Sequence, residues 1–186
     1  MNDNDSVSSI FTVWEPNAYG RDADYAADPI FAVNGGRMAT LAIRFDNGQI
    51  VPVPFGDLDT FAAYDLAKEA KRAVVMEPYN APTENGKTEL LTMIVLPILD
   101  QKNNFLGVIG GAFLLDTFQQ SAEKEHPLGG DVSLISKGGL YIANGENPDE
   151  VGKSFIDAGS NKPLFEQVRK GNLVHKGVNA DGTAVI

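Results

Sequence analysis

The 186-residue chain contains no cysteine, so thiol catalysis, disulfide bonds and cysteine-ligated zinc are all excluded. Only two histidines are present, His126 and His175, and neither lies in a pattern of metal ligands or beside a nucleophile. Both are therefore expected at the surface. Basic residues are also few: 15 Lys and Arg stand against 25 Asp and Glu, which gives a net charge of −10. Because binding to nucleic-acid phosphates needs a basic face, nucleic acid is excluded as a partner.

Long apolar runs are missing too. No stretch approaches the 18 apolar residues of a membrane-spanning helix, and no basic segment precedes an apolar one as in a signal peptide. Hydrophobic residues make up 43% of the chain and charged residues 22%, which is typical of a folded protein with one large domain or two small ones. The chain stops at NADGTAVI, a turn that leads into a new strand, so we expect a piece of a longer protein.

The order of apolar runs and turns predicts an α+β protein with antiparallel strands. Asn47-Gly48, between the second and third strands, is a strong hairpin signal. Strands are predicted at residues 10–15, 37–45, 49–55, 73–79, 89–98, 105–115, 131–136 and 140–144, helices at 58–71, 117–125 and 163–170, and a hairpin at 173–186. The first helix carries an apolar stripe at helical spacing: Leu58, Phe61, Ala62, Leu66 and Ala70. We expect one unit to end near residue 125 and a smaller, incomplete unit to follow it.

Several motifs for catalysis or phosphate binding are incomplete. The glycines of FLGVIGGAFLLD (105–116) do not form GxGxxG, and we interpret them as positions of close backbone approach within a strand. The GKS at 152–154 lacks the glycine that a phosphate loop needs at position 147, where Asn147 stands. The carboxylate pairs at 22/24 and 57/59 lack the calcium-loop pattern. We therefore predict no metal site and no cofactor.

A set of aromatic and basic side chains in loops and at strand ends is a candidate for a small-ligand pocket. Tyr and Trp can form an apolar wall and keep a hydrogen-bonding group inside it. The set comprises Trp14, Tyr19, Tyr25, Arg37, Tyr64 and Tyr79. The alternative interpretation is that these side chains cap the hydrophobic core.

Three stretches of the sequence are informative in combination: WEPNAYGRDADY (14–25), VVMEPY (74–79) and LGVIGGAFLLD (106–116). Together they resemble double Cache (dCache) domains, the extracytoplasmic ligand-binding regions of bacterial chemoreceptors and related sensor kinases. The first is most similar to the methyl-accepting chemotaxis protein branch. The resemblance covers residues 10–125 well and continues more loosely through ISKGGLYIANGENPDEVGKSF.

The resemblance implies a PAS-like antiparallel sheet flanked by helices. Residues 10–125 would form the membrane-distal, ligand-binding Cache module, and residues 130–186 the truncated start of a smaller, membrane-proximal module. The whole protein would be a homodimeric inner-membrane chemoreceptor with this segment in the periplasm, and it would not be an enzyme. The alternatives are the sensor domain of a histidine kinase or diguanylate cyclase, and a small hydrolase that uses acidic residues such as Asp22 and Asp24.

The resemblance also implies a ligand site, and the chain departs from the family pattern there. The implied residues are Trp14, Asp22, Asp24, Tyr25, Arg37, Tyr64, Glu77, Tyr79, Ala112 and Asp116. Ala112 replaces the family aspartate that grips the ligand's amino group, and Leu41 and Ala42 replace an aromatic pair. Removing one partner of a buried charge pair costs about 3–5 kcal/mol. We therefore expect amino acids and polyamines to bind weakly unless Asp22, Asp24 or Glu77 supplies the charge. The remaining partners are a neutral or acidic ligand held by Arg37 and the tyrosines, or a periplasmic binding protein.

Overall fold

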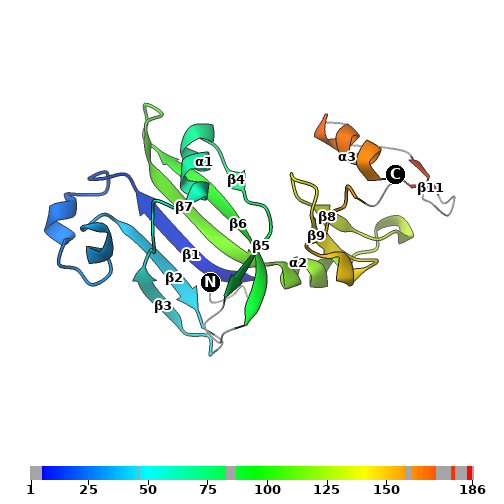
Figure 1. The fold of residues 1–186 in the computed structure, drawn as a ribbon, viewed down its shortest axis with the longest axis horizontal. Coiled ribbons are helices and arrows are strands. Elements are labelled where there is room, and N and C mark those ends of the chain that lie inside the picture. Colours follow the sequence, from blue (N-terminus) through cyan, green and yellow to red (C-terminus); the bar gives the residue numbers. More distant parts are fainter. Residues whose placement is uncertain are drawn as a thin grey trace. The chain divides into compact units, whose positions relative to one another are not determined.

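The computed structural model describes residues 6–45, 47–82, 87–157 and 161–170 and two short strands near the C-terminal end (Figure 1). The chain divides into two compact units, Met1–Thr117 and Phe118–Ile186. The assignment of residues 10–125 and 130–186 to membrane-distal and membrane-proximal modules stays a prediction.

The first unit is built on a seven-stranded sheet with the order β3-β2-β1-β7-β6-β4, in which β5 also pairs with β6. Every pairing is antiparallel, which confirms the predicted α+β class. The strands are β1 (Val7–Trp14), β2 (Ala39–Arg44), β3 (Ile50–Pro54), β4 (Val74–Val75), β5 (Tyr79–Pro82), β6 (Thr88–Leu99) and β7 (Phe105–Leu114). Two 3-10 helices lie between β1 and β2: η1 (Asp22–Tyr25) and η2 (Ala32–Asn34).

The glycines of β7 lie at points of close backbone approach, as predicted. A Cβ atom on Gly110 would lie 2.5 Å from Cζ of Phe11 on β1 and 2.6 Å from the carbonyl oxygen of Ile94 on β6. Phe11 in turn packs edge to face against Phe55 and Phe61, with ring centroids 5.7 and 5.3 Å away. Because Gly110 has no side chain, the Phe11 ring and its aromatic neighbours can occupy the space beside β7.

Helix α1 (Ala62–Ala70) covers one face of the sheet, and two of the three buried residues of the helix are alanines. Ala63 and Ala67 are 2% and 0% exposed, and they pack with Tyr64 in the same core cluster as residues of β1, β6 and β7. The predicted apolar stripe was wrong in part, because Ala62, Leu66 and Ala70 are exposed and the buried residues of the helix are Ala63, Tyr64 and Ala67. The helix also begins four residues later than predicted. The Asp57 carboxylate accepts the backbone N–H of Asp59 at 2.9 Å, and this local bond favours a turn over a helix.

The second unit contains short elements. They are the end of α2 (Leu115–Ala122), η3 (Pro127–Gly129), β8 (Ser133–Ile135), β9 (Tyr141–Asn144), η4 (Pro148–Glu150), α3 (Asn161–Arg169), β10 (Gly177–Val178) and β11 (Ala184–Val185). The Gln119 side-chain amide bonds both the N–H and the C=O of Asn144, each at 2.8 Å. The side chain of His126 is 57% exposed, as predicted, whereas His175 and most of the predicted hairpin at 173–186 lie outside the described residues. None of the described helices is long and apolar enough to cross a bilayer.

Candidate functional site

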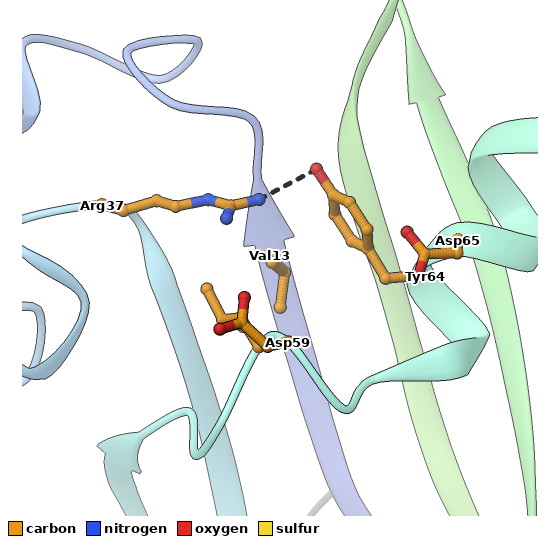
Figure 2. Close-up of a pocket in the computed structure, with 6 residues that line it drawn as sticks. Val13, Arg37, Asp59, Tyr64 and Asp65 are labelled. Carbon is orange, nitrogen blue, oxygen red and sulfur yellow. Dashed lines mark hydrogen bonds between the residues drawn. The ribbon is translucent and has the colours of Figure 1, made fainter.

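A hollow of about 220 Å³ lies beside the end of β1, where the loop before β2 meets α1 (Figure 2). Its lining combines two apolar side chains with one cationic, one phenolic and two acidic ones: Val13, Leu58, Arg37, Tyr64, Asp59 and Asp65. A second, more open hollow of about 530 Å³ shares Arg37, Leu58 and Asp59 with the first. Arg37 therefore contributes to both hollows.

Arg37 reaches toward Tyr64 across the end of β1 (Figure 2). Its Nε donates to the backbone carbonyl of Trp14, and its Nη2 donates to the Tyr64 hydroxyl at 2.9 Å. Its Cζ also lies 5.4 Å from the centroid of the Tyr64 ring. Both acceptors are neutral oxygens, and these two bonds use two of the five N–H donors of a guanidinium group. Arg37 thus has N–H donors beyond these two bonds, and its charge also acts on the nearby Glu15 carboxylate.

The backbone before Arg37 depends on Gly36. This residue is buried and has φ +88°, and a Cβ atom there would overlap the Asp22 carbonyl oxygen and lie 2.8 Å from the Ala26 nitrogen. The loop from β1 therefore doubles back on itself just before Arg37. Only glycine adopts this conformation without strain and without a clash.

Tyr64 links Arg37 to a second pair of charges. Its hydroxyl donates to Oε1 of Glu15, the residue that follows β1, and the Lys68 ammonium donates to the same oxygen at 2.7 Å. Burial and the bond to Glu15 raise the pKa of Tyr64 well above its ordinary value of 10. Burial alone would raise the pKa of Glu15, but the bonds from Lys68 and Tyr64 outweigh it and lower that pKa below 4.5. At neutral pH, Glu15 is therefore a carboxylate and Tyr64 a neutral donor.

Glu15→Gln should flatten the loss of stability on acidification. Because the folded-state pKa of Glu15 is lowered, its contribution is present above about pH 4.5 and is lost as the pH falls through the folded-state pKa. Urea denaturation from about pH 6 to pH 3 measures this slope. Glu69→Gln, which removes the same charge from an exposed position on α1, is the matched control. Equal slopes for the Glu15 variant and the unmodified chain would contradict the prediction.

The residues predicted from the first motif are only partly brought to the hollow. The Trp14 carbonyl oxygen accepts a hydrogen bond from Arg37, while the Trp14 ring packs edge to face on Tyr19, with the ring centroids 5.3 Å apart. The η1 residues lie outside the lining. Asp22 exchanges hydrogen bonds with Asn17, the exposed Asp24 pairs with Arg21 at 3.2 Å, and the exposed Tyr25 packs on Phe31 at 6.2 Å.

The remaining predicted residues do not line the hollow: Ala112 and Tyr79 lie on the sheet, Glu77 lies between β4 and β5, and Asp116 lies in α2. Ala112 is 6% exposed on β7, opposite Ser9 of β1 and Met93 of β6. Tyr79 pairs with Leu91 on β6, and burial raises its pKa. Glu77 and Asp116 are exposed. A role for these four residues in ligand binding stays a prediction.

The candidate set did not include Glu15, Lys68, Asp59 and Asp65. A signal existed for Lys68, because residues four apart on a helix lie on the same side and Tyr64 was already a candidate. Glu15 is 49 residues from Tyr64, and no local pattern joins the two. Within the described ranges, no group of three acidic or histidine side chains is arranged to hold a metal ion.

No protein-family model matches the chain, and no curated protein sequence matches it either. Solved structures do match it. The extracellular domain of mmHK1S-Z2, which is assigned as a histidine kinase, is 21% identical with a TM-score of 0.75, over 99% of this chain and 70% of that one. Methyl-accepting chemotaxis protein X is 20% identical with a TM-score of 0.65, over 89% and 61%.

A third similar structure is the periplasmic sensory domain of the Campylobacter jejuni chemoreceptor Tlp1. It is 18% identical with a TM-score of 0.60, over 98% of this chain and 66% of that one. The chain thus spans less than two thirds of both chemoreceptor structures. The chain shares the α+β fold of these extracellular and periplasmic sensor domains, which agrees with the fold that the sequence resemblance implied.

Proposed function

We propose that this chain is the extracellular sensing domain of a transmembrane receptor and that it binds a small molecule with an acidic group at Arg37. The supporting observation is the guanidinium group of Arg37, whose hydrogen bonds go to two neutral oxygens beside a hollow of about 220 Å³. The planar guanidinium matches the geometry of a carboxylate, and charge-assisted bonds of this kind are the strong ones. Val13 and Leu58 supply the apolar part of the lining.

Amines are expected to bind weakly. Ala112 carries no charge, and Asp22 and Asp24 make their contacts outside the hollow. Asp59 and Asp65 do line it, but both are exposed. Water and salt screen exposed carboxylates, so each adds little to the binding of an ammonium group.

The contacts of Asp22 and Asp24 argue against a hydrolase that uses these two residues, whereas the carboxylates that do line the hollow are Asp59 and Asp65. Catalytic carboxylates would converge on one cleft, whereas Asp22 accepts the backbone N–H of Asn17 at 3.1 Å and stabilises the loop. The neighbouring Asp24 forms its ion pair with Arg21, away from the hollow lining. These contacts are those of structural carboxylates.

The receptor class is proposed as a homodimeric chemoreceptor of the inner membrane. A histidine kinase is the second candidate, because mmHK1S-Z2 matches with the higher TM-score of 0.75, against 0.65 for the methyl-accepting chemotaxis protein. The coding sequence around these 186 codons distinguishes the two. A methyl-accepting output region supports the chemoreceptor, and a kinase core supports the alternative.

A thermal-shift screen tests the ligand class. The panel contains mono- and dicarboxylates, their neutral amides, amino acids and polyamines, and calorimetric titration follows for every compound that shifts the melting temperature. A ligand at about 100 times its Kd stabilises the folded state by about 2.7 kcal/mol. We expect shifts with carboxylates and none with polyamines. Micromolar binding of a polyamine, or no shift with any carboxylate, would contradict the proposal; a complex with a periplasmic binding protein would then replace it.

A further inference from the structure

The hydroxyl group of Tyr64 has a single hydrogen, and in this structure that hydrogen goes to Glu15. The Tyr64 hydroxyl oxygen accepts a hydrogen bond from Nη2 of Arg37 at 2.9 Å. A phenol donates one hydrogen bond at a time. An acidic group that binds Arg37 and also accepts the Tyr64 hydrogen therefore competes with Glu15 for the same donor.

We propose that Glu15 is a specificity-determining residue of the hollow: it is a resident carboxylate that an acidic ligand must displace from Tyr64 in order to bind. This inference rests on the proposed function, and it concerns the Tyr64–Glu15 hydrogen bond that the acidic group of the ligand must replace. A ligand group that accepts hydrogen bonds less strongly than a carboxylate leaves Glu15 in place.

Displacement of Glu15 is feasible because its carboxylate has a second partner and access to water. Lys68 donates to the same oxygen at 2.7 Å, and the Glu15 and Lys68 side chains are 27% and 47% exposed. When Tyr64 turns its hydrogen toward a ligand, Glu15 keeps the ammonium partner and gains water. No charge is left buried and unpaired, which is the costly outcome in such exchanges.

The competition also predicts how a bound ligand would change the contacts between helix α1 and the end of β1. Glu15 and Lys68 belong to the segments that meet at the hollow, the end of β1 and helix α1. A ligand that takes the Tyr64 hydrogen breaks one of the two bonds between Glu15 and α1, and it leaves the Lys68 bond. Ligand binding is thereby coupled to the attachment of α1 to β1, because the ligand and Glu15 share one donor.

A double-mutant cycle on the full 186-residue chain tests the competition, with acetate as the probe. The variants are Glu15→Gln, Tyr64→Phe and the double variant, and acetate is titrated while the Arg37 Nε–H signal is followed by NMR. We expect Glu15→Gln to tighten acetate binding about tenfold with Tyr64 present and less than about twofold with Phe at position 64. Both changes nearly preserve side-chain volume, and thermal unfolding of each variant checks that it is folded.

Asp65→Asn is the matched control. This change removes a carboxylate from the lining of the same hollow. Asp65 is exposed and directly follows Tyr64 in the sequence. If charge alone repels acetate, Asp65→Asn and Glu15→Gln should give gains that do not depend on the residue at position 64. We expect the Asp65 change to have a small effect of about twofold or less in both backgrounds.

The outcomes separate this inference from the proposed function. If acetate binds near Arg37 but the gain from Glu15→Gln is absent, or is equal in the Tyr64→Phe background, the competition is overturned and the acidic-ligand function stands. If acetate binds to none of the variants, the acidic-ligand function is overturned and the inference falls with it. Coupling of the two positions, with no coupling between positions 65 and 64, supports the inference.

Discussion

Replacing Gly110 with alanine should lower the free energy of unfolding by about 2–3 kcal/mol. The new Cβ atom would lie 2.5 Å from the Phe11 ring and 2.6 Å from the Ile94 carbonyl oxygen. Ile94 is held in the β6–β7 register opposite Gly111, and the Phe11 ring is held by Phe55 and Phe61. The strand and the aromatic cluster must both shift to make room, and urea denaturation measures the cost.

Gly56→Ala is the matched control for this experiment. A Cβ atom on Gly56 would meet no atom within 4 Å, and its backbone does not have the positive φ that favours glycine. The change should leave stability within about 1 kcal/mol or raise it slightly, because alanine lowers the entropy of the unfolded chain. Equal losses for the two variants would show that close approach at Gly110 does not limit the packing of β7.

Arg37→Met should weaken the binding of the carboxylate identified in the ligand screen by about 100-fold or more. Truncating one partner of a hydrogen-bonded charge pair costs about 2–5 kcal/mol, and methionine keeps most of the apolar volume of the side chain. The variant also loses the bonds to the Trp14 carbonyl and the Tyr64 hydroxyl, each worth about 1 kcal/mol of folding stability. Calorimetric titration measures the affinity, and thermal unfolding measures the second effect.

Two controls define the role of Arg37. Arg37→Lys keeps the charge but not the planar set of donors, so we expect a smaller loss of about tenfold. Arg21→Met removes an exposed arginine that pairs with Asp24 outside the hollow, and binding should be unchanged. Unaltered affinity in the Arg37→Met variant would place the ligand elsewhere, with the Tyr79 and Ala112 region as the next candidate.

Local sequence signals predicted most of the sheet. The Asn47-Gly48 turn and the flanking apolar runs correspond to β2 and β3, and the two longest runs correspond to β6 and β7. The run at 73–79 is different, because it contains the short strand β4 and reaches β5 only at its last residue. The start of α1 was also missed. There the Asp57 carboxylate accepts the backbone N–H of Asp59, and this bond favours a turn that hydrophobic periodicity does not detect.

The site was less predictable than the fold, because its contacts join distant parts of the chain. Arg37 and Tyr64 were candidates as a cationic and an aromatic side chain, but their mutual bond spans 27 residues. Glu15 had no local signal at all. Its carboxylate becomes important only when the antiparallel sheet brings the end of β1 beside α1. A single sequence does not show that these two segments are close in space.

The alanine side of α1 has a consequence for how this protein can change over evolution. Ala63 and Ala67 set the spacing between the helix and the sheet, and Tyr64 and Lys68 are the residues that follow them. A larger side chain at either alanine would lift the helix and carry the phenol and the ammonium group away from Glu15 together. Ligand preference can therefore drift through substitutions hidden beneath the helix, while every residue that a ligand could touch stays the same.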